Sequence, residues 1–276
     1  MAKKKYSVSR LNTFENCTLK YKLLYLDYLT AEEVSGNINT RKGNVFHEFS
    51  EKYNPDSSIE NQQLLLKSIK IKHDIDESYD FTKPIDLFKI FYEKEFLDKK
   101  DLITSIEREV SLDFETTGLD GKLKNFTAKI DVLVSMVDGS YIIYDYKTSK
   151  TAETRYHVDQ MSLYMKAIQI IKKIPTEDVC SRVQVKLFFP FAAMESDTYL
   201  DVLKNIVITP EILEFHFSKY LEHIDTIEDL SKWTPEAKIN PLCDYCMFSG
   251  TLYCKKSQER GFSAIRGIKI KKKTWS

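Results

Sequence analysis

The sequence predicts an α+β fold in which a mixed central β-sheet is flanked by helices. Residues 1–100 carry large apolar side chains at helical spacing, the pattern changes to that of strands near residue 104, and strand and helix patterns then alternate. The 276 residues contain neither an internal repeat nor a low-complexity linker. We therefore expect a single domain over residues 1–276, with a helical lobe over 1–100, a sheet core over 101–208 and a C-terminal cap over 209–276.

Four segments of the N-terminal part have the spacing of amphipathic helices. In residues 9–29 large apolar side chains recur at helical intervals, and Ser9 is the expected N-cap because its hydroxyl can accept a hydrogen bond from the first turn. Three more helices are expected over residues 43–53, 59–75 and 84–97.

The remainder alternates between strands and helices. Strands are expected over residues 104–114, 126–137 and 141–148, because β-branched and aromatic residues dominate there. The dipeptide Asp138-Gly139, favoured in tight hairpin turns, joins the last two. The remaining elements are a helix over 156–171, strands over 183–189 and 198–208, and a helix from Thr209-Pro210, which has the order of an N-cap and a first-turn proline, to about residue 230.

The strand over 141–148 places an acid and a lysine side by side. Side chains alternate faces along a strand, so Asp145 and Lys147 point the same way. The predicted hairpin brings Asp131, on the preceding strand, to the same end of the sheet. Two carboxylates and a lysine so placed suit a hard divalent cation and an attacking water. On the strand context alone, an ordinary cross-strand ion pair explains the pattern equally well.

The charge balance does not favour a protein that binds nucleic acid through bulk positive charge. Lys plus Arg and Asp plus Glu both number 41, so the formal net charge is zero, and any such binding must use local patches. The lysine runs within 3–5 and 269–273 are candidates, although solvated tails are the commoner outcome. No apolar run approaches the ~20 residues that span a bilayer, so we expect a cytoplasmic protein.

Four of the five cysteines lie toward the two ends of the sequence. Cys243 and Cys246 form a C-x-x-C pattern, Cys254 follows, and Cys17 lies near the start. A disulfide framework is not expected in a large cytosolic chain. A C-x-x-C outside a βαβ unit indicates a metal site before a redox motif. Cys180 precedes a strand-like run, where packing is its ordinary role.

Six short motifs resemble, in their order, those of the RecB-type branch of the PD-(D/E)XK nuclease superfamily. Each is a weak signal alone, but six in the family's order are specific and extend over nearly the whole chain. They are Ser9-Arg10-Leu11 with Phe14, Cys17 and Tyr21; Gly43 with His47; Ile130-Asp131; Asp145-Tyr146-Lys147-Thr148; Gln160 with Tyr164; and Cys243, Cys246 and Cys254. The resemblance implies a core like that of the restriction endonucleases.

The resemblance also implies roles for the site residues. His47, Asp131 and Asp145 would be metal ligands, joined by the backbone carbonyl of Tyr146. This mixed nitrogen and oxygen set suits Mg²⁺ or Mn²⁺, and the imidazole favours manganese. Lys147 would orient or help deprotonate the attacking water and offset the charge that builds on the phosphate.

Three further side chains are candidates for the same site. Gln160 and Tyr164 are four residues apart and share a helix face. The resemblance implies that they contact DNA or position Lys147, and ordinary packing is the alternative. Glu107, in the strand before the hairpin, is either an additional acid of the site or a surface residue.

The cysteines have a counterpart in the iron–sulfur members of this branch, which include AddB and CRISPR-associated nucleases. The resemblance implies a structural [4Fe-4S] cluster on Cys17, Cys243, Cys246 and Cys254, with Cys180 as a substitute for the last ligand. Four thiolates also suit zinc, which remains the alternative metal. Such ligation would tie the N-terminal helix to the C-terminal cap.

The function implied by the resemblance is that of a divalent-metal-dependent DNA nuclease. The leading expectation is an exonuclease on single-stranded DNA or duplex ends, in recombination, repair, replication or CRISPR adaptation, located in the cytoplasm or, if phage-encoded, in the host cytoplasm. The sequence has no G-x-x-x-x-G-K-[S/T] motif, so a motor would come from a helicase or recombination partner. The alternatives are an endonuclease, a non-catalytic DNA-binding scaffold with the same fold, and a zinc-ribbon regulator with an unrelated front half.

Overall fold

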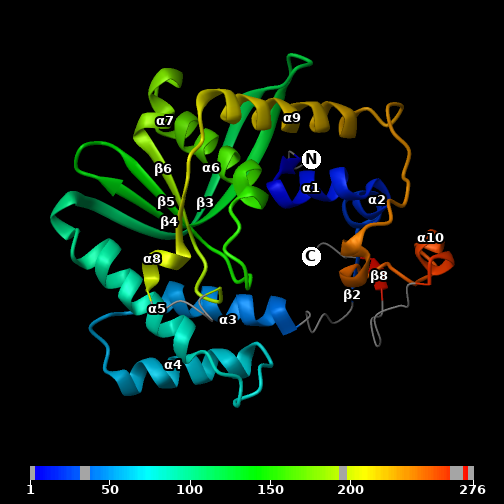
Figure 1. The fold of residues 1–276 in the computed structure, drawn as a ribbon. Coiled ribbons are helices and arrows are strands. Elements are labelled where there is room, and N and C mark those ends of the chain that lie inside the picture. Colours follow the sequence, from blue (N-terminus) through cyan, green and yellow to red (C-terminus); the bar gives the residue numbers. More distant parts are fainter. Residues whose placement is uncertain (1–3, 32–37, 193–197, 262–269, 273–276) are drawn as a thin grey trace. The chain divides into compact units, whose positions relative to one another are not determined.

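The computed structural model describes residues 4–31, 38–192, 198–261 and 270–272 (Figure 1). The chain forms two compact units, each assembled from segments that are distant in sequence. Unit 1 consists of Met1–Asn37, Glu115–Phe126 and Ser218–Ser276, and unit 2 of Ile38–Phe114 and Thr127–Phe217. The organisation of residues 1–276 as a single nuclease domain stays a prediction.

The sheet of unit 2 is mixed, as the sequence predicts. Its strands are β3 (Ile103–Thr117), β4 (Leu123–Met136), β5 (Tyr141–Tyr146), β6 (Val183–Phe188) and β7 (Leu203–Ile206). They pair in the order β3-β4-β5-β6-β7. Strands β4 and β5 are antiparallel, β5 and β6 parallel, and β6 and β7 antiparallel. The parallel pair is joined through α6, as a crossover connection requires.

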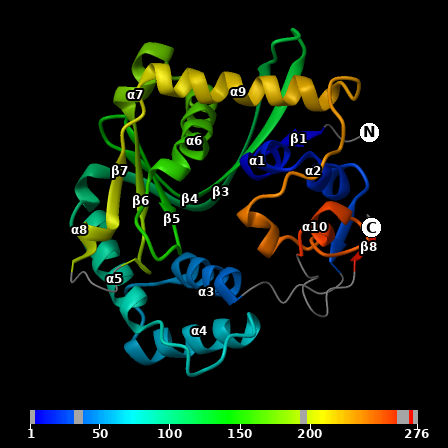
Figure 2. The same ribbon diagram turned by 45° about the vertical axis from the view of Figure 1, so that its right-hand side comes forward.

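Helices surround this sheet. They are α3 (Ile38–Lys52), α4 (Ile59–Lys72), α5 (Thr82–Tyr92), α6 (Val158–Ile171), the single turns α7 (Val179–Arg182) and α8 (Tyr199–Val202), and α9 (Pro210–Glu228), which continues into unit 1. Short 3₁₀ segments occur at Lys100–Leu102, Arg155–His157 and Thr176–Asp178. Figures 1 and 2 show α3 at the end of the sheet where β5 stops, with α4 on the side of α3 away from the sheet.

An aromatic core fixes α3 and α5 on one face of the sheet. Tyr146 of β5 packs edge-on against Phe46 of α3 and Phe88 of α5, each with ring centroids 5.8 Å apart. Phe91 of α5 stacks on Phe188 of β6 at 4.5 Å. Each such pair adds about 0.5–1.5 kcal/mol to the effect of burial alone. Because side chains alternate along a strand, Asp145 lies on the opposite face of β5.

Unit 1 carries the two ends of the chain. Its elements are β1 (Lys5–Tyr6), α1 (Val8–Asn16), α2 (Thr18–Tyr25), β2 (Leu29–Ala31), a 3₁₀ turn (Pro241–Tyr245), α10 (Lys255–Glu259) and β8 (Ile270–Lys272). Strand β1 runs parallel to the start of β4, and β2 pairs with β8 in antiparallel fashion. A small core of Leu23, Ala237, Phe248 and Cys254 joins the N-terminal helices to the C-terminal segment.

Several predicted boundaries are wrong, and each has a local cause. The helix expected over 9–29 is two helices, because Cys17 is extended (φ −165°) and ends the first. The N-cap is Ser7 rather than Ser9: its hydroxyl accepts from the backbone N–H of Arg10.

Two other elements differ in kind from their predictions. The strand expected over 198–208 begins with the single helical turn α8, and only Leu203–Ile206 pairs as β7. The helix expected over 84–97 is α5 followed by a π-helical turn over Glu93–Leu97.

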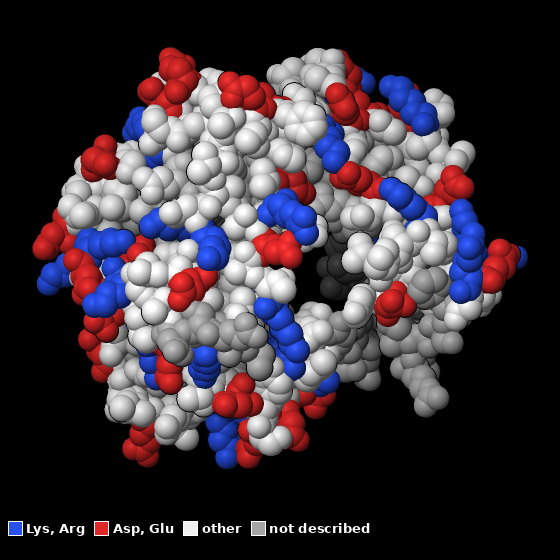
Figure 3. Space-filling view, viewed as in Figure 1, with Lys and Arg blue, Asp and Glu red and all other residues white. Residues whose placement is uncertain are grey.

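The surface charge of the described residues agrees with the zero net charge. On the face shown in Figure 3, basic and acidic side chains are interspersed. Lys271 and Lys272 are exposed in β8, whereas Lys3, Lys269 and Lys273 of the predicted basic ends lie outside the described residues. Within the described part of the chain, no helix has the length and hydropathy needed to cross a membrane.

Candidate active site and cysteine cavity

The β4–β5 hairpin brings Asp131 and Asp145 together. Gly139 occupies the turn with φ +79°, a conformation that favours glycine. The register pairs Val132 with Tyr144, so one step further along the same register Asp131 lies opposite Asp145. The backbone N–H of Tyr146 donates to Asp131 Oδ2 at 2.6 Å. The predicted proximity of the two carboxylates is present in the structure.

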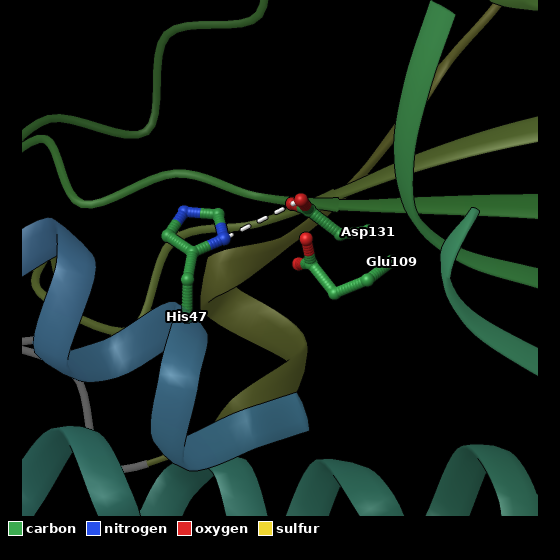
Figure 4. A group of neighbouring side chains, drawn as sticks. All are labelled: His47, Glu109 and Asp131. Atoms are coloured by element: carbon green, nitrogen blue, oxygen red, sulfur yellow. Dashed lines mark ion pairs between the residues drawn. The ribbon is translucent and has the colours of Figure 1, made fainter. Parts of the chain in front are cut away.

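Three side chains from three elements converge on one point (Figure 4). His47 of α3, Glu109 of β3 and Asp131 of β4 each offer a ligand atom, and these atoms lie within 4.8 Å of one another. His47 Nδ1 lies 3.4 Å from Asp131 Oδ1. Burial opposes the charged imidazole, but the hydrogen bond and charge of Asp131 outweigh it and raise the pKa of His47.

Glu109, and not Glu107, is the additional acid of this group. Glu107 is exposed, whereas Glu109 is partly buried. Glu109 has a left-handed backbone conformation (φ +53°), which is uncommon outside glycine and interrupts the alternation of side chains along β3. It also forms an ion pair with Lys129. No sequence pattern predicts such a conformation, so the sequence alone does not identify Glu109 as a residue of the site.

The second predicted pair, Asp145 and Lys147, forms a network beside this group. Lys147 Nζ lies 2.6 Å from Asp145 Oδ2 and donates to Gln160 Oε1 at 2.8 Å. Gln160 Nε2 in turn donates to the Tyr164 hydroxyl at 2.7 Å and reaches Asp145 Oδ1 at 3.5 Å. The structure thus brings all four residues together, on the face of β5 that α6 covers.

Asp145 is the most deeply buried acid of the site, with 3% of its surface exposed. The pKa of this carboxyl is raised to about 6: burial is the largest cause, the nearby charge of Asp131 adds to it, and Lys147 and His47 act in the opposite direction. Asp145 is not one of the three residues whose ligand atoms converge; its expected role as a ligand, and that of the Tyr146 carbonyl, stay predictions.

Gly43 allows α3 to approach the end of β5. A β-carbon at this position would lie 3.2 Å from Thr148 Oγ1, closer than most real contacts. His47 follows one helical turn later, on the same side of α3. The close approach therefore positions the imidazole relative to the carboxylates.

The four predicted cluster ligands surround one cavity in unit 1. Cys17, Cys243, Cys246 and Cys254 line a space of about 140 Å³. Within the described residues, no three cysteine sulfurs all lie within 4.8 Å of one another. Cys17 Sγ accepts from the backbone N–H of Lys20 at 3.4 Å and so caps α2. Burial is the main cause that raises the pKa of Cys246. Cys180 lies in unit 2, on α7.

Comparison with known proteins decides the family. The sequence model of the PD-(D/E)XK nuclease superfamily matches residues 5–251, which include every residue of the candidate active site and three of the four cysteines that line the cavity. This chain belongs to the PD-(D/E)XK nuclease superfamily. The match begins near the N-terminus, so the alternative of a zinc-ribbon regulator with an unrelated front half is excluded.

The remaining comparisons add little to this assignment. No curated protein matches the chain. A crystal structure described as that of SSO0001 resembles this PD-(D/E)XK protein with 13% identity and a TM-score of 0.33, over 87% of this chain and 92% of that chain. Membership in the superfamily supports metal-dependent nuclease activity with DNA as the substrate.

The converging side chains of this PD-(D/E)XK protein fit a divalent cation. One imidazole nitrogen and two carboxylates suit Mg²⁺ and Mn²⁺. A cation there would also offset the negative charge of the neighbouring carboxylates of Asp131, Glu109 and the buried Asp145. When bound, such an ion lowers the pKa of a water and polarises a phosphate.

Proposed function

We propose that this protein is a Mg²⁺- or Mn²⁺-dependent DNA nuclease whose metal is held by His47, Glu109 and Asp131, with Asp145 as a further ligand. The observation that carries the proposal is the convergence of three ligand atoms within 4.8 Å, next to the Asp145–Lys147 pair. A structural ion pair needs neither Glu109 nor His47 at this point. The full arrangement matches the requirements of phosphodiester hydrolysis.

Lys147 acts on the attacking water and the phosphate. Its ammonium is held between Asp145 Oδ2 at 2.6 Å and Gln160 Oε1 at 2.8 Å, which limits its motion. A cation in this place orients the nucleophile and stabilises negative charge as it develops on the phosphate. Gln160 and Tyr164 hold the lysine in position.

The substrate we propose is a single strand or duplex end, degraded as by an exonuclease. Support comes from the resemblance to the RecB-type branch, whose members include exonucleases. The biological setting that fits is DNA recombination, repair, replication or CRISPR adaptation, with a helicase or recombination protein supplying any motor activity.

The test is digestion of end-labelled single-stranded, duplex and circular DNA with Mn²⁺. We expect linear strands to be degraded by the wild type and not by Asp145→Ala or in EDTA, while Glu177→Ala, an exposed acid of the same unit, remains active. Cutting of circles would indicate an endonuclease. Metal-dependent DNA binding with no product on any substrate would contradict the proposal and favour a scaffold.

We further propose that the cysteine cavity of unit 1 holds a [4Fe-4S] cluster with a structural role. A zinc ion with sulfurs at about 2.3 Å holds them roughly 3.8 Å apart. Among the described residues no three cysteine sulfurs all lie within 4.8 Å of one another, and the four cysteines line a cavity of about 140 Å³; both observations support a group larger than a single ion. The expected readout is broad visible absorption and bound iron after anaerobic purification; colourless protein that carries zinc would overturn this assignment.

A further inference from the structure

Unit 2 contains a second cavity, of about 490 Å³, directly beyond the end of β5. This volume lies within the range of about 300–1,000 Å³ that is usual for ligand sites. The walls come from the start of α3, the segment that leads into α5, and the turns after β5 and β6. His47, Glu109, Asp131 and Asp145 are not among the lining residues.

The charge of this cavity is positive although the protein as a whole is neutral. Lys42, Lys83 and Lys150 line it, and Asp80 is the one acid among the described lining residues. Asp80 accepts from the backbone N–H of Thr82 at 2.7 Å, at the start of α5. The three lysines thus outnumber the acid, whose carboxylate is already engaged, and they favour an anionic ligand such as a phosphodiester.

Two aromatic rings accompany the lysines. Tyr79 is half-buried, and Lys42 Nζ lies 3.8 Å from the centroid of its ring. Phe191 packs edge-on against Phe46 and Phe81, at 5.7 and 5.9 Å, which fixes its orientation. Aromatic rings combined with cations are the platform on which proteins bind the bases and phosphates of single strands.

Two segments of the chain contribute residues both to this cavity and to the candidate active site. Lys150 follows Lys147 by three residues, in the turn after β5. Lys42 directly precedes Gly43, where a β-carbon would lie 3.2 Å from Thr148 Oγ1, and His47 lies one turn further along α3. Thr148 also lines the cavity. A strand whose phosphate reaches the metal ligands can therefore place its neighbouring nucleotide here.

We infer that this cavity binds the nucleotide adjacent to the scissile phosphate of single-stranded DNA. Lys42, Lys83 and Lys150 contact backbone phosphates, and the base lies against Tyr79 and Phe191. The inference rests on the proposed nuclease function and assigns a substrate subsite to it. A free nucleotide shares the chemistry of phosphate and base, but three separate lysines match a strand with several phosphates better.

The salt dependence of DNA binding tests the lysines. A fluorescein-labelled single-stranded oligonucleotide is titrated with full-length protein in EDTA at several salt concentrations. The slope of log K against log salt is negative, and each lost phosphate contact reduces its magnitude by about 0.7, so Lys42→Ala/Lys83→Ala/Lys150→Ala should reduce that magnitude by about 2. The matched control, Lys100→Ala/Lys172→Ala/Lys204→Ala, removes the same charge outside the cavity and should leave the slope unchanged.

The contribution of the aromatic platform is measured in the same assay. Tyr79→Ala should weaken binding about 5- to 150-fold, the range expected for one stacked base, whereas Tyr79→Phe should bind as the wild type does. Lys150 is exposed, so Lys150→Glu provides a variant with little risk to folding and should also weaken binding.

Failure of this inference is separable from failure of the nuclease proposal. An equal effect of the two lysine triples, or competition by a nucleoside monophosphate as tight as that of the oligonucleotide, would overturn the subsite even if the wild type cleaves DNA. If the salt dependence of DNA binding becomes weaker only in the cavity variant, but the wild type cleaves no DNA, the DNA-binding site would be supported and the nuclease proposal would be contradicted.

Discussion

At the scale of residues, the site concentrates acids that need a cation. Asp131, Asp145 and Glu109 lie together, and burial and mutual charge raise the pKa of Asp145. Lys147 and His47 offset part of this charge. The negative charge that remains favours the binding of a metal cation.

Glu109 provides the sharpest test of the ligand set. Glu109→Gln keeps the size of the side chain but removes its charge, so we expect Mn²⁺ affinity, measured by calorimetry, to fall about 10- to 100-fold. Glu107→Gln, two residues earlier and exposed, is the matched control. Equal affinities of the two variants would show that Glu109 is not a ligand.

Gln160 distinguishes positioning of the lysine from contact with DNA. If Gln160 acts through Lys147, Gln160→Ala should lower kcat about 10- to 100-fold with KM unchanged, and Lys147→Ala about 10²- to 10⁴-fold. The double variant should then be no worse than Lys147→Ala alone. A rise in KM, with effects that multiply in the double variant, would instead assign Gln160 to DNA binding.

At the scale of elements, the sequence predicts the β4–β5 hairpin but not the conformation of the neighbouring strand β3. Period-two alternation and Asp138-Gly139 predict that Asp131, Asp145 and Lys147 meet, because both signals act over a few residues. The left-handed conformation of Glu109 in β3 has no such signal.

The ends of elements and the long-range contacts were also beyond local patterns. The break at Cys17 follows from an extended residue that caps the next helix with its sulfur, which helical spacing does not show. His47, a single histidine on a helix, carries no signal by itself; only the resemblance predicted its place.

The contact between α3 and the end of β5 leads to a prediction about Gly43. Alanine stabilises a helix by about 1 kcal/mol relative to glycine, but here its β-carbon would press on Thr148 Oγ1 at 3.2 Å. We expect Gly43→Ala to leave the melting temperature nearly unchanged and to lower cleavage about tenfold, because His47 shifts. Adding Thr148→Ala, which removes the pressing atom, should restore most of the activity lost; failure to do so would show that the contact does not set the site.

At the scale of the whole molecule, the two proposed metal sites belong to different units. The carboxylates and His47 lie in unit 2, and the cysteine cavity lies in unit 1, where Cys17 near the N-terminus and Cys254 near the C-terminus line the same space. A metal group bound there, as we propose, would connect segments separated by most of the sequence, which is the arrangement in which a metal contributes most to folding.

Replacing one cysteine should therefore lower the stability of the protein without affecting Mn²⁺ binding at the candidate active site. Cys243→Ser is expected to lose the visible absorption and bound iron and to lower the melting temperature by on the order of 10 °C, while Mn²⁺ affinity of unit 2 persists. Cys180→Ser, on α7 of unit 2, should change neither absorption nor iron content. Retention of iron by Cys243→Ser together with its loss from Cys180→Ser would reverse the ligand assignment. Loss of Mn²⁺ binding by a folded Cys243→Ser protein would show that metal binding in unit 2 depends on the cysteines of unit 1.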